Sequence, residues 1–79
     1  MTQFDLLFEK WERAEYEAIR AEHDLFFALK EYSLGSGLPP TRAEIVITKR
    51  LRHVALERLR DLKTYADSER EIAVNAVMH

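Results

Sequence analysis

The sequence contains no cysteine, and its only two glycines and two prolines lie between Gly35 and Pro40. The absence of cysteine excludes disulfide bonds and thiolate metal sites, and it fits a reducing compartment. The absence of glycine and proline elsewhere leaves two long segments without a helix breaker. The sequence therefore predicts a chain organised as two continuous segments around one short break.

Long apolar runs and a strong net charge are lacking as well. The apolar runs are only a few residues long, which is too short to span a bilayer as a helix. The formal net charge of -2 gives no overall preference for nucleic acid or for a membrane surface. Acidic residues stand near the N-terminus, where a signal peptide carries basic ones. We therefore expect a cytoplasmic protein without membrane association.

The first segment carries apolar residues at alternating spacings of three and four. This pattern is a heptad repeat, which is typical of a helix packed against another helix and which alternating strands do not produce. Thr2 is a plausible N-cap, with the carboxylate of Asp5 in the first turn. The pattern predicts a helix over about 3–33. Its apolar positions are Phe4, Leu7, Trp11, Ala14, Ala18, Ala21, Leu25, Ala28 and Tyr32.

The residues from 34 to 41 predict a loop and the start of a second helix. Gly35 suits the left-handed conformation that ends a helix, and the prolines cannot continue one. Thr41 and Glu44 have the spacing of a capping box, so the second helix is predicted over about 42–75. Ser68 and Glu71 have the same spacing, and a break near 66–68 is the alternative. One continuous helix is favoured because no glycine or proline forces a break.

The short loop makes the two helices antiparallel neighbours, so the predicted fold is a single all-α hairpin domain. Its helices carry more apolar surface than one partner covers, because packing on a single helix hides a stripe only about 100° wide. Each large apolar side chain left in water forgoes about 1.5–3 kcal/mol of burial. Association is therefore expected. The residues predicted to form the interface are Phe8, Trp11, Ile19, Phe26, Val46 and Leu56.

A homodimer that forms a four-helix bundle is the favoured assembly. Two alternatives remain open. In one, the hairpin is a monomer whose additional aromatic side chains fold over its ends. In the other, a helical protein of different sequence completes the bundle.

Two glutamates, Glu15 and Glu22, lie seven residues apart inside the apolar arc of the first helix. Folding the chain about its loop brings Glu15 level with Arg58 and Glu22 level with Arg52. We interpret Glu15 and Arg58 as an ion pair that fixes the antiparallel register. A metal site of carboxylates inside a bundle is the competing interpretation, and it needs Glu-x-x-His motifs on two helices. Arginines stand where those glutamates would be, so no metal site is predicted.

No residue pattern in the chain indicates catalysis or a cofactor. His23, His53 and His79 share no helical face, and we expect them at the surface. No serine or threonine has the setting of a nucleophile, and the Gly-Ser-Gly of the loop lacks the spacing and lysine of a phosphate-binding loop. A bare hairpin also offers little concave surface for a substrate. An enzyme is the class of function that the sequence supports least.

Charge is divided unevenly along the chain. Residues 1–34 contain eight acidic and four basic residues, whereas residues 41–63 contain seven basic and three acidic residues. A basic helix can bind phosphate backbones. It can equally be neutralised by the acidic first helix, which would favour the antiparallel pairing. The candidate nucleic-acid contacts are Lys49, Arg52, Arg60 and Lys63.

The function expected from these features is that of a non-catalytic interaction or scaffold protein. An apolar helix face would supply affinity, and flanking charges would select the partner and its orientation. Two alternatives stay open. One is a small RNA- or DNA-binding regulator that uses the basic part of the second helix. The other is a secretion-type co-chaperone that covers a client helix.

Overall fold

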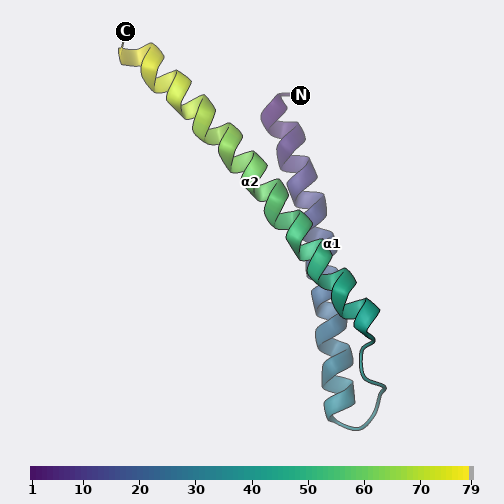
Figure 1. Ribbon diagram of the computed structural model, residues 1–79. Helices are drawn as coiled ribbons and strands as arrows, with labels where there is room; N and C mark the ends of the chain where they lie inside the picture. The colour runs from purple at the N-terminus through teal and green to yellow at the C-terminus, as the bar shows by residue number, and fades with distance from the viewer. Residues whose placement is uncertain (79) are drawn as a thin grey trace.

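The structure is a computed structural model that describes residues 1–78 and consists of two helices. Helix α1 spans Gln3–Ser33 and helix α2 spans Arg42–Met78. The helices run antiparallel from the loop that joins them, and they cross at a shallow angle (Figure 1). The chain is elongated, with extents of 67 × 21 × 18 Å. The predicted all-α hairpin is confirmed. Among the described residues no helix is long and apolar enough to cross a membrane.

Both helices begin at a threonine cap. The Oγ1 of Thr2 accepts a hydrogen bond from the amide of Asp5 at 3.2 Å, and the Asp5 carboxylate accepts one from the amide of Thr2 at 3.1 Å. This is a complete capping box, although the sequence indicated only an N-cap here. At α2 the Oγ1 of Thr41 accepts from the amide of Glu44 at 3.2 Å. That bond is one half of the capping box expected there.

Helix α1 ends in a motif that Gly35 makes possible. Its φ of 77° lies in the left-handed region, as the sequence predicted. The amide of Gly35 donates to the carbonyl of Tyr32, and the amide of Ser36 donates to the carbonyl of Glu31, both at 3.0 Å. This pair of bonds is a Schellman motif, which satisfies two carbonyls left free at the helix end. The chain then turns toward Thr41 and α2.

The seam between the helices buries few side chains. Among the described residues, the buried apolar ones are Ala18, Ala55 and Leu62. Thr48 is buried as well, and its hydroxyl donates to the carbonyl of Glu44 at 2.8 Å, so its polar atom is satisfied within its own helix. Two of the three buried apolar side chains are alanines, which allow close approach of the backbones but contribute little hydrophobic burial. The single hairpin therefore has a thin core.

The helices diverge at the end opposite the loop (Figure 1). Helix α2 is continuous through Ser68 and extends past residue 75, where the sequence predicted its end. Every residue from 66 to 77 is exposed. Two heptad positions of α1, Phe4 and Tyr32, are exposed as well. On α2 the exposed large apolar side chains include Ile47, Leu59 and Ile72.

Candidate interaction surface

A charged cluster at the middle of the hairpin joins the two helices. Arg52 of α2 reaches across to α1, where its Nη1 donates to Glu15 Oε2 at 2.7 Å. Its Nε and Nη2 donate to the two carboxylate oxygens of Glu22, at 2.9 and 2.5 Å. One guanidinium thus binds two carboxylates that lie two turns apart on α1, one of them through two parallel bonds. We call these three residues the arginine cluster.

The charges of the cluster stabilise one another. Hydrogen bonds from Arg52 lower the pKa of Glu22 below its ordinary value of 4.5. The hydrogen bond to Glu22, followed by the contact with Glu15, raises the pKa of Arg52 further above its already high value. Glu22 and Arg52 are therefore both ionised near neutral pH. The cluster contains two carboxylates and one guanidinium.

The cluster corrects the predicted register pair. Glu15 is paired with Arg52 and not with Arg58, which is exposed and forms no ion pair among residues 1–78. The expected alignment of Glu22 with Arg52 is present. The pairing of Glu15 with Arg52 in place of Arg58 has a geometric reason. Glu15 and Glu22 lie two turns apart on one face, so a long arginine side chain placed between them can reach both.

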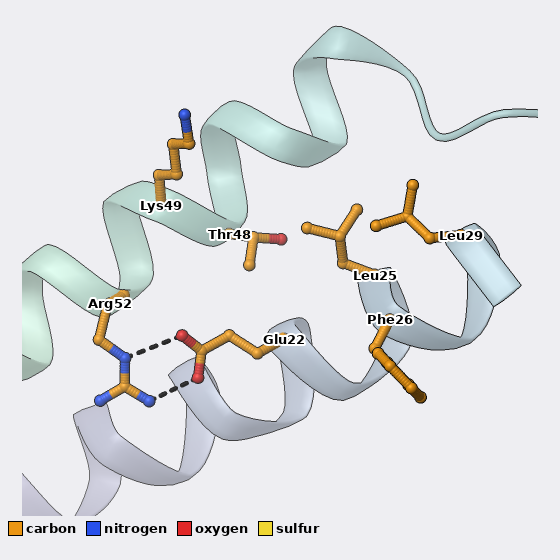
Figure 2. A pocket seen from close by; sticks show the side chains of 7 residues that line it. All are labelled: Glu22, Leu25, Phe26, Leu29, Thr48, Lys49 and Arg52. Carbon is orange, nitrogen blue, oxygen red and sulfur yellow. Dashed lines mark hydrogen bonds and ion pairs between the residues drawn. The ribbon is translucent and has the colours of Figure 1, made fainter.

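Next to the cluster, the two helices enclose a shallow hollow toward the loop (Figure 2). Leu25 and Leu29 of α1 point toward Thr48 of α2, and Lys49 points away from α1. The ring of Phe26 points out of the hollow, away from α2. The hollow is thus walled by apolar side chains, with Glu22 and Arg52 at one end. It is open to solvent and offers an apolar surface beside charged groups.

The same side of the hairpin carries several exposed apolar residues around the arginine cluster. Ile19 lies between Glu15 and Glu22 at helical spacing, and Phe26 follows Glu22 by four residues, so they share one face of α1. Leu56 follows Arg52 by four residues on α2. Ile19 is 54% exposed, Phe26 67% and Leu56 54%. We call this surface the aromatic flank. Its members are Phe8, Ile19, Phe26 and Leu29 of α1 with Leu56 and Leu59 of α2.

Two of the predicted interface residues lie elsewhere. Trp11 is half-buried, and its ring lies 5.5 Å from the ring of Phe8, so it supports the edge of the aromatic flank from within the seam. Val46 precedes the buried Ala55 by nine residues, or two and a half turns, which places it on the outer side of α2. It therefore does not join the aromatic flank. Ile45 and Thr48, which the sequence analysis did not select, are the covered residues of that turn.

The opposite side of the hairpin has a different composition. On α1 it presents Lys10, Glu17 and Asp24, which recur every seven residues and are all exposed. A second hollow on this side is lined by Asp24 together with Glu44 and Ile47. We call this side the opposite flank. Between Lys10 and Ala28 the α1 residues of this side alternate charged and small side chains, whereas α2 exposes the large apolar Ile47 here.

The four candidate nucleic-acid contacts do not form one free cationic surface. Arg52 is bound to two carboxylates of α1. The Nζ of Lys63 lies 3.4 Å from a carboxylate oxygen of Asp67. Lys49 lines the hollow described above, and Arg60 is exposed three turns further along α2. These contacts weaken the interpretation of α2 as a phosphate-binding helix.

Other polar residues form only local pairs. His53 and Glu57 lie four residues apart with 2.9 Å between Nε2 and Oε1, and His23 lies beside Asp24; both histidines are exposed. His79 lies outside the described residues. Within residues 1–78 no group of three or more histidine and carboxylate side chains is placed to hold a metal ion. The aromatic flank and its arginine cluster are thus the features with the clearest potential for binding.

The chain was compared with models of protein families, with curated proteins and with solved structures, and none of the three comparisons gives a match.

Proposed function

We propose that the protein is a non-catalytic interaction module that works as a homodimer, in which two hairpins bury their aromatic flanks against each other and form a four-helix bundle. The observation that carries the proposal is the aromatic flank itself. Large apolar side chains that recur at helical spacing along most of α1 remain exposed in the single hairpin. Soluble monomers rarely expose such a continuous apolar band.

The thin core gives independent support. Ala18, Ala55 and Leu62 are the apolar residues that the hairpin buries among those described. Small domains without disulfides or metals usually need association to offset the entropy of folding. A stable interface buries about 800 Å² on each partner, which is about an eighth of the 6714 Å² surface of this chain.

Two adjacent phenylalanines of α1 test the proposal. Phe26 belongs to the aromatic flank, whereas Phe27, which is 57% exposed, points to the outer side of α1. Glutamine is an uncharged helix former, so Phe26→Gln and Phe27→Gln change polarity equally with little effect on helix propensity. We expect Phe26→Gln to weaken the dimer by at least about tenfold through lost burial, and Phe27→Gln to leave it nearly unchanged.

Sedimentation equilibrium over a wide concentration range measures both dissociation constants. Circular dichroism of each variant at high concentration shows whether its helices are intact. A wild-type chain that stays monomeric at all concentrations would refute the homodimer. Equal weakening by the two substitutions would show that the apolar surface acts without a defined interface.

A further inference from the structure

A dimer that pairs the aromatic flank with its own copy has two symmetric arrangements. If the two-fold axis runs along the hairpin, both loops lie at the same end and α1 packs on the partner's α2. If the axis runs across the hairpin, the loops lie at opposite ends and each helix packs on its own copy. All neighbouring helices are antiparallel in both cases, so helix packing alone does not choose between them.

The charges of the two helices favour one of these two arrangements. The segment that forms α1 has twice as many acidic as basic residues, and the first part of α2 has the reverse excess. Packing α1 on the partner's α2 places opposite charges across the interface. Packing each helix on its own copy places like charges there, which opposes association and selects against that arrangement.

The arginine cluster also favours the arrangement in which α1 packs on the partner's α2. Glu15 and Glu22 lie near the middle of α1, so an axis across the hairpin at that level brings Glu15 of each chain opposite Glu22 of the other chain. With the axis along the hairpin, the partner's α2 lies opposite them instead. Lys49 of that helix lines the same hollow as Glu22 and points away from its own α1 (Figure 2). It forms no ion pair among the residues that the structure describes.

We infer that the occupant of the aromatic flank is a second copy of this chain with its loop at the same end, and that Lys49 of each chain faces the two carboxylates of the other chain's cluster, which outnumber its single guanidinium. This inference rests on the proposed homodimer and specifies its orientation. The arginine cluster then acts as a polar layer that sets which helix meets which, while the apolar residues supply the affinity.

Distances between spin labels test the orientation directly, because the chain has no native cysteine. Leu38 in the loop is 87% exposed and is a suitable position for a Leu38→Cys label. Loops at the same end predict a separation below about 30 Å, since neighbouring helix axes lie about 8–10 Å apart. Loops at opposite ends predict more than about 45 Å, the length of a 31-residue helix.

A label at Glu17→Cys is the matched control, since this exposed residue lies near the middle of α1 and gives a short distance in both arrangements. A short distance at both positions supports the inference. A short distance at position 17 with a long one at position 38 overturns the orientation but leaves the homodimer intact. Absence of dipolar coupling at both positions means that no dimer forms, which overturns the proposed function and the inference together.

Reversing the charge of Lys49 gives a second test, because the two arrangements predict opposite changes in the dissociation constant of the dimer. If Lys49 faces the partner's carboxylates, Lys49→Glu should raise the dissociation constant roughly tenfold. If Lys49 instead faces the partner's basic helix, the same change removes repulsion and should tighten the dimer, which would overturn the inference. Arg50→Glu makes the same charge change at the next residue, on the outer side of α2. It should alter the dissociation constant much less than Lys49→Glu does.

Discussion

The two flanks of the hairpin are built on the same helices but differ in what they leave exposed. The aromatic flank presents large apolar side chains around one charged cluster, whereas the α1 residues of the opposite flank between Lys10 and Ala28 alternate charged and small side chains. The alanines of α1 explain the difference. They occupy the seam and the edge of the opposite flank, so the large side chains of α1 lie on its other edge. On α1, the aromatic flank therefore leaves more large apolar surface exposed than the opposite flank does.

A large effect on stability is expected from removing the cation of the arginine cluster, Arg52. Arg52→Met leaves Glu15 and Glu22 as adjacent unpaired carboxylates. Breaking a fully buried ion pair costs about 3–5 kcal/mol. Here the side chains are 28–42% exposed, so we expect a loss of about 2 kcal/mol. Urea unfolding at neutral pH measures this loss.

Arg58→Met is the matched control for that change. Arg58 is exposed and forms no ion pair among residues 1–78, so its replacement should alter stability by less than about 0.5 kcal/mol. Equal losses in the two variants would show that the arginine cluster contributes no more than an isolated surface charge.

An effect of similar size is expected from the seam that separates the two flanks. Ala18 is fully buried, so Ala18→Leu forces the helices apart and should cost about 1–3 kcal/mol. Ala73→Leu makes the same change on an exposed turn of α2 and should be nearly neutral. Thermal unfolding of both variants checks this. An unchanged melting temperature in Ala18→Leu would show that the helices are not closely packed there.

The smallest effect is expected from acid. Because the pKa of Glu22 is lowered in the folded chain, its contribution to stability is complete above the unfolded value of 4.5. This contribution is lost as the pH falls through the lower folded value. The Glu22→Gln variant lacks this group, so its stability should change less than that of the wild-type chain between about pH 5 and pH 2.

Asp5 also contributes to the loss of stability in acid. Its pKa is also lowered, first by the backbone hydrogen bond from Thr2, so some loss of stability in acid should persist in Glu22→Gln. Urea unfolding at several pH values gives the slope of the free energy of unfolding against pH for the wild-type chain and for Glu22→Gln. Identical slopes in the two chains would mean that Glu22 is not stabilised by Arg52 in solution.

Much of the local structure was predictable, because its signals are local. Gly35 and the prolines specify the loop, Thr2 and Thr41 cap the helices, and the heptad spacing specifies the face of α1 that meets α2. The candidate surface was predictable only in part. Phe8, Ile19, Phe26 and Leu56 do lie together on one exposed flank, but Val46 lies on the outer side of α2.

By itself the sequence determined two long helices, the break between them and the presence of more apolar surface than one hairpin buries. These properties depend on backbone preferences and side-chain periodicity within a few turns. Only the tertiary structure decided that Arg52 binds both Glu15 and Glu22, and that α2 beyond residue 65 stands clear of α1. Both outcomes depend on the crossing and offset of the helices. Those are set by close packing around Ala18 and Ala55, and no local pattern along one helix specifies them.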